Sequence, residues 1–313
     1  MKRTILTAIP VNGRHRSLLR EAAGDENLLF VDRKTLTQEQ VDQAEIVLGN
    51  IPPQMVQKAQ RLQWLQLNSA GYDAYARKEI MGQRILTCCT GAYGQAVSEH
   101  LFAMLLAMQK KLPQYRDDQR RHVWGDQGPV VSIADSTILV LGLGDIGSHF
   151  ARLAHALGAR VIGVKRTPEA CPEYVEQVCG TADILSLLPQ ADAVVSFLPS
   201  TEETRKIAGA DWFRRMKPGS FFLNGGRGDT VDTEALCQAL REGQLAGAAL
   251  DVTDPEPLPA DHPLWDTPGV FLTPHVSGGY HLPVTLDRVV EICADNLRRY
   301  RAGEPLRNVV RCL

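Results

Sequence analysis

The chain has 313 residues and a formal net charge of −2, with acidic and basic residues interspersed along it. This length suits two domains that each bury a core, and the mixed charges offer no basic face for nucleic acid. Its apolar stretches are shorter than the roughly 18 residues of a membrane helix, so we expect no membrane association. Seven cysteines without a metal-binding spacing are typical of a reducing compartment, which predicts a cytoplasmic protein with no metal site.

The first hundred residues alternate short apolar strands with helical segments, which predicts a parallel α/β sheet with right-handed crossovers. The expected strands are Ile5–Ile9, Leu28–Val31, Ile46–Leu48, Trp64–Leu67 and Ile85–Thr87, with helices such as Gln38–Ala44 and Pro53–Gln60 between them. A longer apolar-periodic helix is expected from about Gln95 to Lys111.

The polar segment from Pro113 to Asp135 has little periodicity. It is a linker, a loop over the active site, or an arm that grips a second subunit. A second sheet is expected from Thr137 onward, with strands at Ile138–Leu141, Val161–Val164, Ala193–Phe197, Ser220–Leu223, Ala248–Val252 and Val270–Leu272. A final helix is expected from about Pro283 to Tyr300.

The motif Gly142-Leu143-Gly144-Asp145-Ile146-Gly147 lies between an apolar strand and a helical stretch. In a dinucleotide-binding βαβ unit, Gly142 allows the tight turn, Gly144 lets the backbone approach a pyrophosphate, and Gly147 lets the helix pack against the strand. The N–H groups at the start of that helix, at Asp145 and Ile146, then face the phosphates. The alternative is a glycine-rich turn in another kind of α/β protein.

Lys165-Arg166-Thr167 follows the second strand of this unit, where an NAD site usually has an acidic residue for the ribose 2′-hydroxyl. Two cations and a hydroxyl suit a 2′-phosphate instead, because Arg offers a planar fork of donors and Lys a point charge. We therefore predict that NADP(H) is preferred and NAD(H) is possible, with Arg166 as the main contact. A solvated basic turn is the alternative.

Four polar residues lie at the ends of three of the later strands. Arg227 comes after one strand, in Gly225-Gly226-Arg227, Asp251 closes the next strand with Glu256 in the loop after it, and His275 follows the last strand. The carboxyl ends of parallel strands share one edge, so these residues should gather beside the glycine motif. Reduction of a ketone by hydride needs a proton donor such as His, a carboxylate to orient it, and an Arg to polarise the carbonyl and bind a carboxylate. Each residue could instead have a purely structural role.

Several blocks in this order resemble the D-isomer-specific 2-hydroxyacid dehydrogenase family. They are Ala96-Val97-Ser98-Glu99-His100, the glycine motif, Leu223 to Asp232, Leu250-Asp251-Val252 with Glu256 to Pro259, Pro263-Leu264-Trp265, and Thr273 to Gly278. The resemblance implies that His275 is the general acid/base, Glu256 its partner and Arg227 the substrate-orienting cation. It implies further that Asp251 contacts the nicotinamide carboxamide, and that backbone N–H groups at Ala70-Gly71-Tyr72 bind the substrate carboxylate. Further cofactor contacts are expected at Leu198, Pro199, Thr204, Gly225, Gly226 and Gly278.

The same resemblance implies two Rossmann-like, doubly wound parallel-sheet domains separated by an active-site cleft. Residues 1–97 and 283–313 would form a flavodoxin-like substrate domain, and residues 98–282 the dinucleotide-binding domain. Such proteins form homodimers through the cofactor domains, which would make the segment from Pro113 to Asp135 an inter-subunit arm. One departure is Gly226, where the family commonly has a small Ala or Ser.

The predicted activity is interconversion of a 2-keto acid and a D-2-hydroxy acid, in practice reduction, with glyoxylate or hydroxypyruvate as first choices. One alternative is a cofactor-sensing protein or corepressor without turnover. Another is a relative that oxidises a different small substrate, such as formate or phosphite. Tyr72, Tyr93 and Tyr280 either line the pocket or serve as packing, and Trp124 either reaches a neighbouring subunit's site or fastens the arm.

Overall fold

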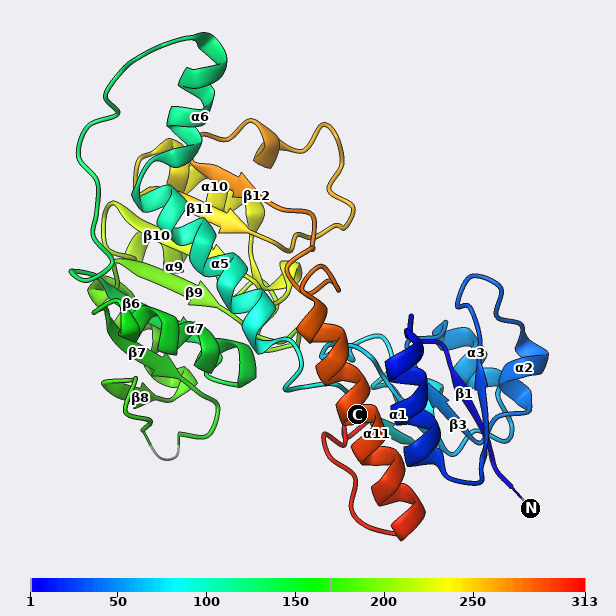
Figure 1. Ribbon diagram of the computed structural model, residues 1–313. Coiled ribbons are helices and arrows are strands. Elements are labelled where there is room, and N and C mark those ends of the chain that lie inside the picture. The colour runs from blue at the N-terminus through cyan, green and yellow to red at the C-terminus, as the bar shows by residue number, and fades with distance from the viewer. Residues whose placement is uncertain (1, 169–170, 313) are drawn as a thin grey trace. The chain divides into compact units, whose positions relative to one another are not determined.

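The computed structural model describes residues 2–168 and 171–312 (Figure 1). Two compact units divide the chain, the first formed by Met1–Tyr93 with Tyr280–Leu313 and the second by Gly94–Gly279. Each contains one parallel sheet with helices, which confirms the predicted fold class. The chain leaves the first unit at 93/94, where 97/98 was predicted, because helix α5 (Gly94–Gln109) belongs entirely to the second unit. It re-enters the first unit at 279/280, where 282/283 was predicted.

The first unit contains a five-stranded sheet in the order β2-β1-β3-β4-β5, the strand order of flavodoxin-like folds. Its strands are β1 (Thr4–Thr7), β2 (Asn27–Phe30), β3 (Ile46–Leu48), β4 (Trp64–Gln66) and β5 (Ile85–Thr87). Its helices are α1 (Gly13–Ala23), α2 (Gln38–Asp42), α3 (Pro53–Lys58), α4 (Lys78–Met81) and α11 (Pro283–Ala302). Helices α1 and α11 lie side by side, so the returning C-terminal helix completes one layer of this unit (Figure 1).

Local sequence signals set the ends of these two paired helices. Asn12 caps α1 by accepting a hydrogen bond from the backbone N–H of His15 (3.0 Å), and the helix stops at Gly24, whose φ is +62°. Helix α11 begins with Pro283 at a first-turn position and ends at Gly303 with φ +71°. Both ends therefore follow from residue types that the sequence displays.

The second unit contains a seven-stranded sheet in the order β12-β11-β10-β9-β6-β7-β8, again all parallel. Its strands are β6 (Thr137–Leu141), β7 (Arg160–Val164), β8 (Gln177–Cys179), β9 (Ala193–Ser196), β10 (Ser220–Asn224), β11 (Leu245–Leu250) and β12 (Val270–Leu272). Its helices are α5, α6 (Leu112–Arg121), α7 (Asp145–Ala156), α8 (Ile184–Leu187), α9 (Ala210–Arg215) and α10 (Thr233–Arg241). Short 3₁₀ helices cover Thr181–Asp183, Leu188–Gln190, Gly228–Thr230 and Pro263–Trp265.

Burial explains which strands the sequence revealed. All residues of β9 and β10 are buried, because helices cover both faces of the sheet, and such strands read as continuous apolar runs. Strand β8 lies at the edge of the sheet and has only three residues, beginning with an exposed Gln177. It carries no apolar run and was not among the predicted strands.

Helix α6 and the segment that follows it extend away from the seven-stranded sheet (Figure 1). A helix was not expected in this polar stretch, where only linker, loop or arm was considered. It has one buried residue, Asp118, so no apolar periodicity marks it in the sequence. The segment exposes Leu112, Val123, Trp124, Val130 and Val131.

No helix within the described residues has both the length and the apolar character needed to cross a membrane.

Candidate active site

The predicted site residues of the second unit follow strands on either side of the point where its strand order reverses. Strand β6 pairs with β7 on one side and with β9 on the other, so the loops after β6 and β9 lie next to each other. A Cβ added to Gly142, whose φ is +89°, would lie 2.9 Å from the carbonyl oxygen of Phe197. Ligands of open α/β sheets bind at this kind of switch point.

The three motif glycines have different surroundings. A Cβ on Gly147 would lie 2.2 Å from the backbone oxygen of Gly142, so this close approach of helix α7 to the loop requires glycine. A Cβ on Gly144 would meet no atom within 4 Å, and Gly144 provides no side-chain cap for the helix that begins at Asp145. The surface above Gly144 is thus open, beside a helix N-terminus, as a pyrophosphate requires.

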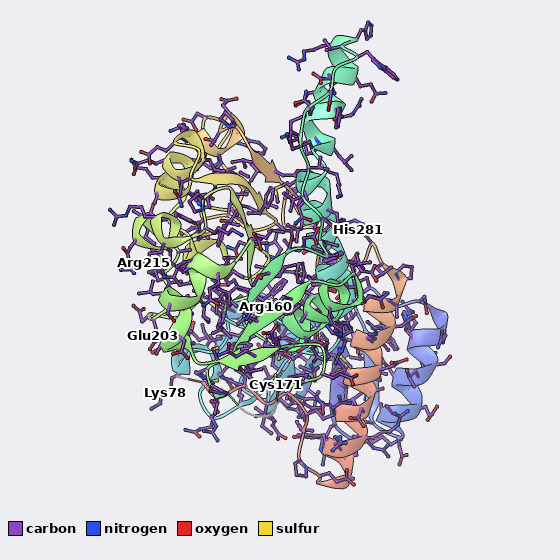
Figure 2. The ribbon with its side chains drawn as sticks, turned by 90° about the vertical axis from the view of Figure 1, so that its left-hand side faces the viewer. Lys78, Arg160, Cys171, Glu203, Arg215 and His281 are labelled. Atoms are coloured by element: carbon purple, nitrogen blue, oxygen red, sulfur yellow. The ribbon has the colours of Figure 1, made fainter. Side chains whose placement is uncertain are left out.

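The predicted adenosine end lies after strand β7, where Lys165, Arg166 and Thr167 are all exposed. Glu203, labelled in Figure 2, lies on the loop after β9. A hydrogen bond from Thr201 and its own backbone N–H lower the pKa of Glu203, and the charge of Arg166 contributes further.

The loop after β9 folds back on itself. Leu198 is buried and Pro199 exposed, and the hydroxyl of Thr204 donates to the backbone oxygen of Pro199 (2.6 Å). A Cβ on Gly226 would lie 2.5 Å from the backbone oxygen of Leu198. Glycine at position 226 therefore allows the loops after β9 and β10 to pack more closely than Ala or Ser would.

His275 and Glu256 form a hydrogen-bonded pair. Nδ1 of His275 lies 2.8 Å from Oε2 of Glu256, and the other carboxylate oxygen accepts from the backbone N–H of Thr253 (3.0 Å). The side chains remain 51% and 38% exposed, so the ring is held through Nδ1 while it stays accessible. His275 also has a φ of +50°, a left-handed conformation that is uncommon for a residue other than glycine.

Asp251 supports the loop that carries His275. Its backbone oxygen accepts from the His275 N–H (2.7 Å), and its buried carboxylate accepts from four further donors. Those donors are Thr273 Oγ1 (2.6 Å), Val276 N (3.0 Å), Ser277 N (3.1 Å) and Ser277 Oγ. Four acceptances match the capacity of one carboxylate, so Asp251 fixes the backbone on both sides of His275.

His100, on helix α5, completes this network. Its Nε2 lies 3.0 Å from Thr273 Oγ1 and 3.8 Å from Asp251 Oδ1. Because the hydroxyl proton of Thr273 goes to Asp251, the contact requires the hydrogen of His100 to be on Nε2. Thr273 directly follows the last strand, so its place at the carboxyl edge of the sheet could be predicted from the sequence. His100 lies 173 residues earlier in the chain, and spacing gives no hint of its contact.

Arg227 is held by the loop after β10. The side chain of Asn224 accepts from the Gly226 N–H (3.0 Å) and donates to the backbone oxygen of Arg227 (2.8 Å). A guanidinium nitrogen of Arg227 donates to the Gly226 backbone oxygen (2.8 Å), and a Cβ on Gly228 would lie 2.0 Å from the Thr253 backbone oxygen. The loops that carry Arg227 and Glu256 are therefore packed together within the second unit.

Ala70, Gly71 and Tyr72 lie in the first unit, on the loop after strand β4. The carbonyl oxygens of Gly71 and Tyr72 accept hydrogen bonds from Ser69 Oγ and from Tyr75 N, respectively. Among residues 2–168 and 171–312, none accepts a hydrogen bond from the backbone N–H groups of these three residues. Successive backbone N–H groups of this kind can bind an anion.

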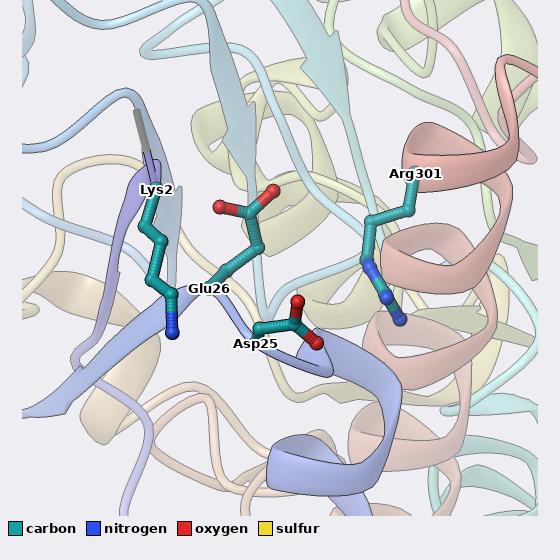
Figure 3. Close-up of a pocket in the computed structure, with 4 residues that line it drawn as sticks. All are labelled: Lys2, Asp25, Glu26 and Arg301. Atoms are coloured by element: carbon teal, nitrogen blue, oxygen red, sulfur yellow. The ribbon is translucent and has the colours of Figure 1, made fainter.

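Other candidate sites contribute less. Over the described part of the chain, no group of His, Cys, Asp and Glu side chains could hold a metal ion. A pocket in the first unit is lined by Lys2, Asp25, Glu26 and Arg301 (Figure 3). Two of its charges already have partners, since Glu26 pairs with Arg3 and Arg301 donates to the backbone oxygen of Ala22.

Two parallel α/β units, one with a glycine motif at the switch point of its sheet, define a dinucleotide-binding protein. Residues 102–277 match the family model of the NAD binding domain of D-isomer specific 2-hydroxyacid dehydrogenases. The chain is 30% identical to glyoxylate/hydroxypyruvate reductase B of Escherichia fergusonii, over 85% of this chain and 84% of the relative. It therefore belongs to the D-isomer specific 2-hydroxyacid dehydrogenase family, whose members are oxidoreductases of small keto and hydroxy acids.

Two solved structures of family members cover nearly the whole chain. A family protein from Aeromonas salmonicida subsp. salmonicida A449 has 33% identity and a TM-score of 0.88 over 99% of both chains. A dehydrogenase from Xanthobacter autotrophicus Py2, in complex with NADPH and MES, has 28% identity and a TM-score of 0.83, over 99% of this chain and 98% of that one. The recognised resemblance is thus confirmed.

Proposed function

We propose that the protein is an NADP(H)-preferring reductase that converts a small 2-keto acid into a D-2-hydroxy acid. The observation that carries the proposal is the hydrogen-bonded pair of His275 and Glu256 (2.8 Å), accessible to solvent and held on a loop in a strained conformation. A cofactor-sensing protein without turnover has no need for such a pair.

The residues around the glycine motif fit a dinucleotide. The open space above Gly144 and the uncapped start of helix α7 suit the pyrophosphate, with contacts from Asp145, Ile146 and the loop of Leu198, Pro199 and Thr204. When bound, the reduced nicotinamide supplies the hydride. Gly225, Gly226 and Gly278 would border it, and the backbone near Asp251 would keep His275 in place beside it.

The chain's own groups then supply the rest of the chemistry. His275 gives a proton to the carbonyl oxygen as negative charge develops there, and Glu256 holds the ring through Nδ1, which leaves Nε2 for the substrate. Arg227 orients the substrate and stabilises the developing charge. The free N–H groups of Ala70, Gly71 and Tyr72 bind the carboxylate.

The preference for NADP(H) rests on Lys165 and Arg166, which are exposed after β7 in place of an acidic ribose contact. The Xanthobacter autotrophicus relative was solved with NADPH. Arg166→Ala should weaken NADPH binding by about tenfold or more and leave NADH binding nearly unchanged, because only NADPH carries the 2′-phosphate. Arg152→Ala, which removes another exposed arginine of this unit, is the matched control. If the variant loses affinity for NADPH and NADH equally, Arg166 does not contact the 2′-phosphate.

Glyoxylate and hydroxypyruvate are the first substrates to test, since the Escherichia fergusonii relative is named for both. Purified protein is mixed with NADPH or NADH and a panel of 2-keto acids, and loss of the reduced nicotinamide is followed. Faster turnover with NADPH on a small keto acid supports the proposal. Tight NADPH binding without turnover favours the cofactor sensor, and turnover only with formate or phosphite in the oxidising direction favours the third alternative.

We propose further that the chain forms a homodimer through its dinucleotide-binding domain, with the segment from Pro113 to Asp135 as an inter-subunit arm. Its exposed apolar side chains, among them a fully exposed Trp124, are more than a surface loop usually carries. Trp124→Ala should shift sedimentation toward the monomer, whereas Trp265→Ala, another exposed tryptophan of the same unit, should leave it unchanged. A wild-type monomer would refute the proposal.

A further inference from the structure

Two tyrosines of the first unit converge on Asn68, which lies in the loop after strand β4. The hydroxyl of Tyr93 donates to the backbone oxygen of Asn68, and the Asn68 side-chain amide donates to the hydroxyl of Tyr280 (2.5 Å). Tyr93 is buried and Tyr280 is half-buried. Both phenols are therefore packed within the first unit and hydrogen-bonded to the loop.

Asn68 in turn fixes the loop. It exchanges hydrogen bonds with Asn50, whose backbone N–H donates to Asn68 Oδ1 (2.6 Å) while the Asn68 N–H donates to Asn50 Oδ1 (3.0 Å). The Asn50 amide also donates to Ser69 Oγ (2.9 Å), and Ser69 Oγ donates to the backbone oxygen of Gly71 (2.6 Å). A continuous chain of contacts runs from the two phenols to the candidate carboxylate-binding segment.

These contacts occupy the backbone carbonyl oxygens of the loop and the N–H of Asn68, and they leave the N–H groups of Ala70, Gly71 and Tyr72 available. The backbone oxygens of Asn68, Ser69 and Gly71 all accept hydrogen bonds. By contrast, the N–H groups of Ala70, Gly71 and Tyr72 have no acceptor anywhere in residues 2–168 and 171–312. An anion site gains affinity when such donors are held in place before the ligand arrives.

The positions of the two tyrosines in the chain add a second observation. Tyr93 is the last residue of the first unit before the chain passes to the second, and Tyr280 is the first residue after its return. Burial raises the pKa of both phenols, so both hydroxyls keep their protons over the working range of pH. The chain thus has a neutral tyrosine at each of the two points where it crosses between the units, and both tyrosines are hydrogen-bonded to Asn68.

We propose that Tyr93 and Tyr280 are positioning residues that, through Asn68, hold the segment Ala70-Gly71-Tyr72 in the conformation that binds the substrate carboxylate. They act on the loop and do not touch the substrate. This inference rests on the proposed function, because it assigns the carboxylate of a 2-keto acid to that segment. It also gives the two tyrosines a role other than lining the pocket.

The test compares Tyr93→Phe and Tyr280→Phe with Tyr300→Phe. Each change removes one hydroxyl and keeps the ring. Tyr300 is the matched control, because its hydroxyl contacts Gln63 at the opposite end of strand β4 (2.9 Å). We expect KM for glyoxylate or hydroxypyruvate to rise about fivefold in each of the first two variants, with the Kd of NADPH unchanged and KM of the control unchanged. An unchanged KM in both variants, or an equal rise in the control, would overturn the proposal.

Amide hydrogen exchange provides a readout that does not need turnover. In the first two variants, the hydrogen-bonded amides at the loop, which are the N–H groups of Asn50, Asn68 and Cys89, should exchange at least several times faster than in the wild type, while the control matches the wild type. If the wild type reduces no 2-keto acid, the proposed function fails, and amide exchange alone decides whether Tyr93 and Tyr280 hold the loop. If the wild type is active but neither KM nor amide exchange changes in the variants, the positioning role of the two tyrosines fails and the proposed function stands.

Discussion

Thr273→Val tests whether the network around Asp251 positions His275. Valine has nearly the shape of threonine but no hydroxyl, so the change removes the 2.6 Å hydrogen bond to Asp251 Oδ1 and the 3.0 Å contact with His100. The other hydrogen bonds to the Asp251 carboxylate remain, and so does the backbone bond from His275 N–H to Asp251 O (2.7 Å). The variant should fold, with a loosened loop before His275.

The size of the effect follows from the groups involved. A hydrogen bond to a charged group contributes about 1.5–3 kcal/mol, and here a buried carboxylate loses one of its four donors. We expect the free energy of unfolding to fall by about 2 kcal/mol. If half of that loss appears as mispositioning of His275 in the transition state, kcat falls about fivefold, since 1.36 kcal/mol corresponds to a factor of ten.

The assays are urea unfolding and steady-state kinetics with NADPH and the preferred keto acid. Thr267→Val is the control, because the Thr267 hydroxyl is also in a hydrogen bond within the same unit, but to the backbone oxygen of Pro263 (2.8 Å). The control should lose about 1 kcal/mol of stability and keep its kcat. A Thr273→Val enzyme with unchanged kcat would refute the idea that Asp251 acts on His275 through this loop.

Three further predictions concern the cofactor site, the acid/base group and a buried phenol. Gly144→Ala should fold normally but bind NADPH at least about tenfold more weakly. Gly147→Ala places its Cβ 2.2 Å from a backbone oxygen, so this variant should lose about 3 kcal/mol in its free energy of unfolding. Equal stability of the two variants would contradict this. His275→Ala should lower kcat by about 10²- to 10⁴-fold while NADPH titration still shows binding, and an unchanged kcat would exclude its role as acid. Burial raises the pKa of Tyr93 above its ordinary value of 10.0, so the folded state holds that proton more tightly; this stability is present below pH 10.0 and lost as pH rises above it. Between pH 10.0 and about pH 11, the free energy of unfolding measured with urea should therefore fall less for Tyr93→Phe than for the wild type. If it falls equally with pH in both proteins, the raised pKa of the Tyr93 phenol is contradicted.

Much of the fold was predictable because the strands are buried on both faces. Runs such as Ile46–Leu48 and Ser220–Leu223 contain almost no polar residue, and their spacing with helices allows only parallel sheets. Helix α6 was missed because Asp118 is its one buried residue, and no apolar face marks it in the sequence. Strand β8 was missed because three residues at an exposed edge form no pattern.

For the site, the sequence by itself determined the glycine motif, the basic turn at Lys165 and Arg166, and the order in which Arg227, Glu256 and His275 follow their strands. These are local signals, since strand ends and turn glycines are visible residue by residue. Only the tertiary structure decided that Asp251 accepts four hydrogen bonds from the His275 loop, that His100 reaches Thr273, and that Tyr93 and Tyr280 meet at Asn68. Those contacts join side chains up to 212 residues apart, and their geometry is set by the packing of loops and helices, which no spacing in the sequence encodes.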